Sequence, residues 1–298
     1  MTQFLQYFFN GLSSGAIYSL LALGLVIVYR GSGHLNFAQG EMAMVAAFFA
    51  WWYSGRLPIG IAVLAAAATS FVLASGVERF IIRPIGHRSQ FAVVVASIGL
   101  FLGLNALAPF AWKVSNPVAF PSLFPNEPGD FLRLGGATWR YERIGALVVL
   151  LVVAGLLFLL FQKTKLGLAM RAVASNRESA PLVGIKTGSV LMVSWGLAAF
   201  VGAIGGALVA SINGNANPAM MFTIFFSAAA AATLGGFDSV GGAVLSGIVL
   251  GVVENMAAGY QPDVIGQDLR FGVSLVIILI VLLVRPSGLF GSQRVERV

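Results

Sequence analysis

Cysteine is absent from this chain of 298 residues, and histidine occurs only twice. The missing thiols exclude disulfide bonds and thiolate metal sites. His34 and His87 fall in separate predicted loops, so no serine–histidine pair and no histidine-rich metal spacing is visible. A phosphate-binding GxxxxGK[ST] loop is also missing. The sequence therefore predicts no catalytic residue, metal site or cofactor in this chain, and any ATP and magnesium that drive it must bind to another polypeptide.

Charge is scarce as well: 10% of the residues are charged and 58% are hydrophobic, whereas soluble proteins contain about 25% charged residues. This composition predicts an all-α, polytopic membrane bundle, with residues 1–298 forming a single transmembrane domain. The net charge of +7 could suggest nucleic acid in a soluble protein. Here the basic residues fall between apolar runs, so orientation in a lipid bilayer explains them better. The first apolar run lacks a basic segment before it, and we expect it to be mature structure and not a cleaved signal.

The apolar runs predict about eight or nine transmembrane helices, some of them broken or half-length. Met42–Trp52 is too short to cross a hydrocarbon core of roughly 30 Å, so we expect this helix to begin at membrane depth among the polar residues 35–41. Phe222–Leu234 is also short and is typical of a broken or re-entrant segment. The other runs are Phe4–Tyr29, Ile59–Val77, Phe91–Phe110, Ile144–Phe161, Val190–Ala210, Ala243–Ala258 and Phe271–Val284.

The basic residues predict the orientation of the chain. An outside N-terminus and an inside C-terminus satisfy the positive-inside rule and require an odd number of spans. Residues 111–143, rich in proline and glycine, then form an external loop. Twelve of the 18 Lys and Arg residues lie inside in this arrangement: Arg30, Arg79, Arg83, Arg88, Lys163, Lys165, Arg171, Arg177, Lys186, Arg285, Arg294 and Arg297.

Four GxxxG pairs recur inside the apolar runs. Such pairs let helix backbones approach closely where lipid supplies no hydrophobic drive for association, and we interpret them as structural packing. Asn105 is expected to hydrogen-bond between helices. The pairs are Gly11/Gly15, Gly99/Gly103, Gly202/Gly206 and Gly247/Gly251.

Polar residues at membrane depth are candidates for a substrate pathway. Asn36 and Gln39 have the spacing of a helix N-cap and its reciprocal partner, and a helix that begins inside the bilayer directs free N–H groups into a cavity. Glu41 would cost about 2.5–3.5 kcal/mol near the bilayer centre, so it should face a cavity or a partner. The alternative is that all three side chains only satisfy backbone groups where the helix breaks.

Two more polar residues complete the predicted substrate pathway. Asn10 lies on the first span with Ser13, Ser14 and Tyr18, and we expect this face to point toward protein. Glu254 lies at the end of Ala243–Ala258, where the alternative role is an interfacial anchor.

Residues 162–189 form a polar, basic loop between two apolar runs. Leu166, Met170 and Val173 fall at helical spacing, which predicts an amphipathic helix along the membrane surface. A simple turn would need only a few residues, so this loop is predicted to dock a cytoplasmic partner.

Eight stretches of the chain match one known family as a set: Leu35–Glu41, Ile82–Pro84, Gly167–Arg177, Gly184–Ile185, Leu234–Gly236, Gly241–Gly242, Leu250–Glu254 and Arg285–Gly288. With them the chain resembles, over nearly its whole length, the permeases of branched-chain amino-acid ABC importers, of the LivH type. The resemblance implies a multi-pass permease of the bacterial inner membrane that forms the path for branched-chain or related hydrophobic amino acids. It also implies a second homologous permease (LivM type), two ATPase subunits and a periplasmic solute binding protein as partners.

Within the loop, Glu178-Ser-Ala180 followed by Gly184 resembles the EAA loop that docks ATPases in ABC importers. A serine replaces the middle alanine, and Pro181 lacks a backbone N–H, so a helix through Ala180 should kink or restart there. The resemblance implies that ATPase docking involves Arg171, Asn176, Arg177, Glu178, Ala180 and Gly184.

Other functions remain open. Relatives within the same family carry urea, short amides or aromatic carboxylates, and their permeases look much alike. A stand-alone, ion-coupled transporter would need acidic residues inside its spans, for which only Glu41 and Glu254 are candidates. An intramembrane hydrolase would need a nucleophile–base pair, and none is plausible here.

Overall fold

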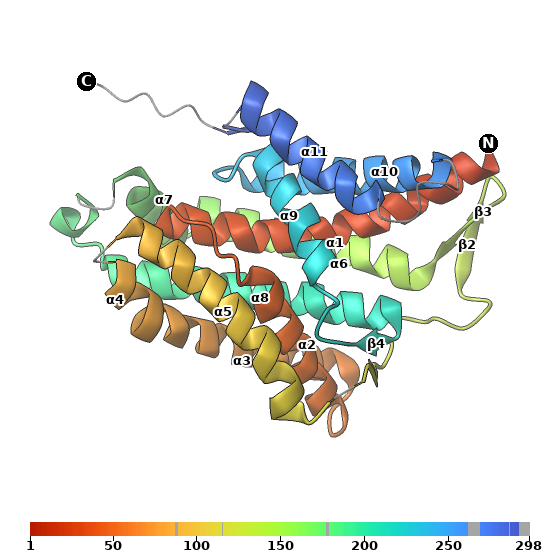
Figure 1. The fold of residues 1–298 in the computed structure, drawn as a ribbon, viewed down its shortest axis with the longest axis horizontal. Coiled ribbons are helices and arrows are strands. Elements are labelled where there is room, and N and C mark those ends of the chain that lie inside the picture. The colour runs from red at the N-terminus through yellow and green to blue at the C-terminus, as the bar shows by residue number, and fades with distance from the viewer. Residues whose placement is uncertain (87–88, 115, 177–178, 262–268, 286, 292–298) are drawn as a thin grey trace.

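The computed structural model describes residues 1–86, 89–114, 116–176, 179–261, 269–285 and 287–291. Its long helices run roughly along one direction (Figure 1). The N-terminus and the hairpin β2–β3 lie at one end of the bundle, which we call the N-terminal end. Helices α4 and α7 lie at the opposite end, which we call the α7 end. Every apolar run predicted from the sequence coincides with a helix of this bundle.

The bundle consists almost entirely of helices. Two short antiparallel pairs accompany them: β1 (Val118–Ala119) with β4 (Asn215–Ala216), and β2 (Phe131–Leu134) with β3 (Ala137–Arg140). The helices are α1 (Thr2–Ser32), α2 (Gln39–Ser54), α3 (Ile59–Val77), the π-helix η1 (Glu78–Ile82), α4 (Arg83–Gly86), α5 (Gln90–Trp112), α6 (Tyr141–Lys163), α7 (Lys165–Ser175), the 3-10 helix η2 (Ala180–Val183), α8 (Thr187–Asn213), α9 (Phe222–Gly235), α10 (Val240–Tyr260) and α11 (Leu269–Val284).

Within the described residues, six helices are long and apolar enough to cross a membrane, and two further apolar helices are shorter. The long ones are α1, α3 with its extension to Gly86, α5, α6, α8 and α10. The short ones are α9 and residues 272–284 of α11. These lengths are those of a polytopic membrane bundle. As predicted, α2 begins among the polar residues 35–41, at Gln39, and it has 16 residues.

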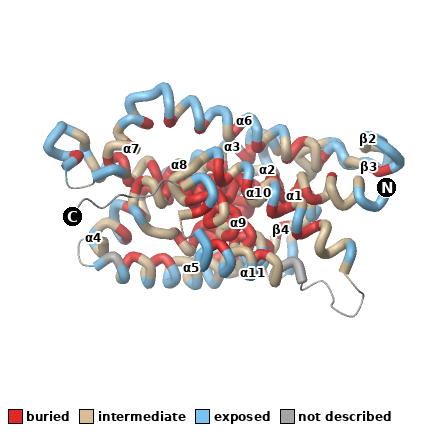
Figure 2. The backbone as a smooth tube through the Cα atoms, turned by 90° about the horizontal axis from the view of Figure 1, so that it is seen from above, coloured by how far each residue is buried: buried red, intermediate tan, exposed pale blue. Residues whose placement is uncertain are grey.

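The core lies around α1 and α8, which are surrounded by other helices. Figure 2 shows buried residues concentrated along these helices and along α2, α9 and α10, whereas α5 and α6 carry long exposed stretches. The exposed side chains of α5 and α6 are large and apolar, such as Phe91, Leu102 and Leu156. A soluble protein would not expose them so widely, but in a membrane they face lipid.

Glycine pairs bring several helices into backbone contact, as predicted. A Cβ atom on Gly11 or Gly15 would lie 2.6 Å from a backbone Cα atom of α10, so α1 and α10 pack through Gly11/Gly15 and Gly247/Gly251. Gly202 and Gly206 of α8 likewise pack against α2, at Gln39 and Ala43. Gly99/Gly103 differ, because no described atom lies within 4 Å of a Cβ placed there. This pair therefore packs no helix of the described chain.

The predicted external loop contains a hairpin that covers the N-terminal end of α1. Gly135 and Gly136 both have positive φ, which a two-residue turn between β2 and β3 requires. The Gln6 side chain exchanges hydrogen bonds with the Thr138 backbone, at 2.9 Å in both directions. The Trp139 ring stacks on Phe9 with centroids 4.8 Å apart. The hairpin is thereby fixed over the end of α1.

Candidate functional site

A polar pocket of about 320 Å³ opens among α1, α6, α8, α9 and α10, nearer the N-terminal end of the bundle. Asn10, Ser13, Ser14 and Tyr18 line it, which confirms that this face of the first helix points toward protein. The remaining lining residues are Ile17, Arg143, Val209, Ile212, Asn213, Thr223, Ile224, Ser227, Glu254 and Asn255. Ten of the 14 lining side chains are therefore polar, and the other four are aliphatic.

The carboxylate on one side of the pocket is anchored by hydroxyl groups from two other helices. Glu254 of α10 is 1% exposed, and its Oε1 accepts a hydrogen bond of 2.9 Å from Ser227 of α9. Ser274 of α11 also donates to Oε1. A buried acid needs such partners. The cluster also joins α9, α10 and α11 at the pocket wall.

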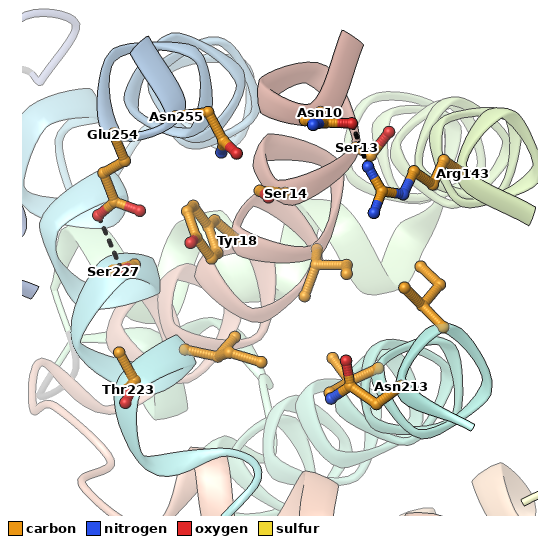
Figure 3. A pocket seen from close by; sticks show the side chains of 14 residues that line it. Asn10, Ser13, Ser14, Tyr18, Arg143, Asn213, Thr223, Ser227, Glu254 and Asn255 are labelled. Carbon is orange, nitrogen blue, oxygen red and sulfur yellow. Dashed lines mark hydrogen bonds between the residues drawn. The ribbon is translucent and has the colours of Figure 1, made fainter. Parts of the chain in front are cut away.

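A guanidinium group lies on the opposite side of the pocket. Figure 3 shows Arg143 and Asn10 across the pocket from Glu254. Arg143, near the start of α6, donates a hydrogen bond to the Asn10 side-chain oxygen. The same oxygen accepts from Gln6, whose amide also bonds the hairpin. Asn10 and Glu254, which lie far apart in the sequence, thus line the same pocket. Arg143 lines it as well, although the sequence analysis did not predict it as a pathway residue.

The residues at the start of α2 lie elsewhere and are completely buried. Asn36 and Gln39 have no exposed surface, and they contact each other at 3.4 Å. The predicted N-cap is wrong in detail, because the helix begins at Gln39 with Ala38 as its cap residue. The Asn36 side chain instead accepts from the Ala38 backbone N–H at 3.1 Å. The helix therefore starts two residues later than the capping-box spacing predicts, with Ala38 in place of Asn36 as the cap residue.

Gln39 connects α2 to the centre of the bundle. Its side-chain amide donates to the Ala198 carbonyl of α8 at 2.9 Å. A Cβ on Gly202 would lie 2.9 Å from the same nitrogen, and Gly24 borders it from α1. Only glycines leave room for this amide between the two helices. Gln39 therefore holds the start of α2 against α1 and α8.

Glu41 is also completely buried, at 0% exposure. Its Oε2 accepts a hydrogen bond from Asn105 of α5 at 3.1 Å, and the same amide donates to the Pro218 carbonyl before α9. Asn105 thus hydrogen-bonds between helices, as predicted. Among the described residues, Glu41 Oε1 has no hydrogen-bond partner. Asn36, Gln39 and Glu41 therefore contact protein in this structure, and their role in a substrate pathway stays a prediction.

At the α7 end, the predicted amphipathic helix is present as α7. Thr164 caps it by accepting from the Gly167 N–H at 3.1 Å. Met170 and Val173 are each 2% exposed and face the bundle, while Arg171 bonds Gln162 at 3.1 Å on the exposed side. This helix lies against the ends of α1, α6 and α8.

The segment after α7 differs from a simple basic loop. Asn176 accepts from the Ser179 N–H at 2.9 Å, and Ala180, 3% exposed, begins the 3-10 helix η2. Pro181 occupies its first turn, where a missing N–H is tolerated. Gly184 ends it with φ of +81°. The helix thus restarts at the proline, as predicted.

The end of η2 exposes two apolar side chains, Leu182 at 86% and Val183 at 75%. Of the predicted docking residues, Arg177 and Glu178 lie outside the described residues. Ala180 begins η2 and Gly184 ends it. We call Leu182 and Val183 the η2 tip. The sequence prediction concentrated on the basic residues and missed this tip, although two apolar residues between a proline and a glycine were visible.

A bundle of apolar helices with a polar pocket toward one end and an exposed segment at the other defines a polytopic membrane transport protein. Residues 7–283 match the family described as "Branched-chain amino acid transport system / permease component". The chain therefore belongs to this family of ABC-importer permease subunits, which are multi-pass proteins of the bacterial inner membrane.

Individual relatives agree with this assignment. The chain is 31% identical to BraD, a high-affinity branched-chain amino acid permease of Pseudomonas aeruginosa, over 99% of this chain and 98% of that protein. It is 29% identical to LivH of Escherichia coli, with the same coverage of 99% and 98%. Among solved structures, PsaBC from Streptococcus pneumoniae has the same fold, with a TM-score of 0.50 and 15% identity over 95% of this chain and 92% of that one. BraD and LivH are permease components of transport systems and not enzymes.

Proposed function

We propose that this chain forms part of the path by which branched-chain or related hydrophobic amino acids cross the membrane, and that the polar pocket belongs to this path. The amide, hydroxyl and charged groups around the pocket can bind the carboxylate and ammonium groups of an amino acid. Ile17, Val209, Ile212 and Ile224 offer apolar surface for an aliphatic side chain. At about 320 Å³, the pocket is at the small end of the range for small-molecule sites, about 300–1,000 Å³.

The N-terminal end of the bundle faces outward in this proposal, and the α7 end faces the cytoplasm. The positive-inside rule supports this orientation, because residues 162–189 and 78–88 hold eight of the 18 Lys and Arg residues, and the inner side holds twelve in all. Nine crossings, with α2, α9 and α11 as the short ones, bring the C-terminus to the cytoplasmic side. The pocket then lies nearer the side from which a periplasmic solute binding protein delivers cargo.

The proposed partners at the α7 end are two ATPase subunits, one for this chain and one for a homologous second permease. The η2 tip supports this docking, since an apolar pair exposed to water is a typical anchor for another protein. Lys163 at the end of α6, and Lys165 and Arg171 on α7, add positive charge to this end of the bundle. ATP and magnesium would be bound by those subunits.

The proposal gives a secondary role to the three buried residues Asn36, Gln39 and Glu41. Their contacts tie α2 to α1, α5 and α8, and a movement of α2 would uncover the Glu41 carboxylate. We propose that they border the path in another conformation of the transporter.

Reconstitution tests the proposal. Proteoliposomes would contain this chain, its second permease and the ATPases, and the loaded binding protein would be added outside. We expect leucine, isoleucine or valine uptake that requires ATP inside, together with ATP hydrolysis stimulated by the loaded binding protein. Uptake by this chain alone under an ion gradient would contradict the proposal and favour a secondary transporter. Uptake of urea or an aromatic carboxylate alone would contradict the cargo.

A further inference from the structure

The helical extension of α3 contains a π-helix, η1, whose geometry brings two charged residues together. The Arg83 backbone N–H bonds the Glu78 carbonyl, five residues earlier. In an α-helix, where successive residues are about 100° apart, residues five apart would point about 140° away from each other. A π turn brings them onto one face. Pro84 follows directly and cannot supply the next helical N–H.

The side chains of the same two residues form a two-point ion pair. Arg83 Nε lies 3.1 Å from Glu78 Oε1, and Nη2 lies 2.6 Å from Oε2. The Glu78 side chain is 2% exposed, whereas that of Arg83 is 27% exposed. A buried carboxylate bound twice by one guanidinium has a defined geometry. The π turn and the ion pair therefore hold each other in place.

The guanidinium also reaches a third group, on a different helix. Arg83 Nη2 donates at 2.6 Å to the Gly188 carbonyl, in the first turn of α8. A Cβ at position 188 would lie 2.6 Å from Arg83 Nη1, so a side chain there would require the guanidinium to shift. Only three residues separate Gly188 from Gly184, where η2 ends. The ion pair is thus attached to the segment that carries the η2 tip.

Further contacts continue along the same two helices. Ser75 of α3 donates to the Met192 carbonyl of α8 at 3.1 Å. One turn further along α8, Gly196 leaves space for Ser75 and the Phe71 ring. The N-terminal half of α8 is therefore fixed to the C-terminal half of α3 at three successive turns, and Arg83 makes the contact nearest η2.

We propose that Arg83, held by Glu78 and η1, is a positioning residue that transmits movement of the docking segment to α3. The proposal rests on the docking of ATPases at the η2 tip. A displacement of η2 moves the first turn of α8, and the Gly188 contact carries this displacement to η1. Without the contact, α8 and α3 move separately at this end, and ATP hydrolysis no longer produces transport.

The test uses the full transporter, reconstituted with its ATPases and loaded binding protein, and measures uptake per ATP hydrolysed. We expect Arg83→Gln to lower this ratio at least tenfold while the ATPases still co-purify. Gly188→Ala should have the same effect, because its methyl group displaces the guanidinium from the carbonyl and leaves Glu78 in place. Arg79→Gln is the matched control: Arg79 lies on the same π turn, is exposed, and stacks over Phe80 at 5.7 Å.

A charge exchange separates transmission from simple stability. The double variant Glu78→Arg/Arg83→Glu can restore the ion pair, but its carboxylate at position 83 cannot donate to the Gly188 carbonyl. We expect thermal stability to recover relative to Arg83→Gln and the uptake ratio to stay low. Recovery of the ratio, or a normal ratio in Gly188→Ala, would overturn the proposal. Loss of ATPase binding in Arg83→Gln would also overturn it, whereas a wild-type transporter that never binds ATPases would overturn the docking itself.

Discussion

Replacement of the η2 tip by charged residues should weaken the binding of the ATPase subunits. Leu182 is 86% exposed and Val183 is 75% exposed, so both can be buried almost entirely by a partner. Burial of one such side chain contributes about 1.5–3 kcal/mol. Part of this gain is offset by about 0.5–1.5 kcal/mol for immobilising each side chain. Taking the midpoint of each range, the pair contributes about 2.5 kcal/mol of binding free energy.

The double variant Leu182→Asp/Val183→Asp removes this contribution and adds two carboxylates that lose solvation at the interface. We expect the Kd for the ATPase subunits to rise at least about 30-fold. The assay titrates labelled ATPase subunits onto the permease pair in lipid nanodiscs. Thermal unfolding of the permease should change little, because neither side chain packs in the core.

The matched control is Leu132→Asp, an exposed leucine on β2 at the N-terminal end of the bundle. It introduces the same chemistry and should leave the Kd unchanged. A Kd for the η2 variant within about twofold of the wild type would refute the reasoning, because it would show that the ATPase subunits do not bury Leu182 and Val183.

Three other substitutions test the helix packing, the pocket and the end of η2. Gly251→Leu should separate α1 from α10 and destabilise the chain by about 1–3 kcal/mol or more, seen as a lower melting temperature, whereas Gly99→Leu should leave the isolated chain unchanged. Glu254→Leu removes the acceptor of two serine hydroxyls, at about 1–3 kcal/mol, and should reduce uptake more than Glu254→Gln does. Gly184→Val forces a β-branched residue to φ of +81°, at about 1–2 kcal/mol, and should lower uptake per ATP hydrolysed while membrane insertion persists.

Local sequence patterns predicted the helices well, because apolar length is decisive in a membrane. The bounds predicted for α3 coincide with those observed, and the length of Met42–Trp52 predicted that α2 begins among residues 35–41, as it does at Gln39. The π-helix η1 was not predicted. It depends on an ion pair between Glu78 and Arg83 and on a third contact from Gly188, more than a hundred positions away. Apolar periodicity carries no signal for such a contact.

The pocket could be predicted only in part. Asn10 and Glu254 were identified as polar residues inside apolar runs, and the polar face of α1 was assigned to the protein side. Arg143 was one of the six bases left on the outer side, because it ends the predicted external loop 111–143. Its contact with Asn10 requires the packing of α1 against α6, which no local pattern encodes.

The most direct test of the account asks which side of the membrane each end of the bundle faces, and whether the η2 tip is covered by a partner. The absence of native cysteine makes single-cysteine variants simple to label with a membrane-impermeant maleimide. We predict that Leu182→Cys reacts only in inverted vesicles and is protected when the ATPase subunits bind, while Leu132→Cys reacts only from the outer side. Labelling of Leu182→Cys from outside, or equal labelling with and without the ATPases, would contradict the account.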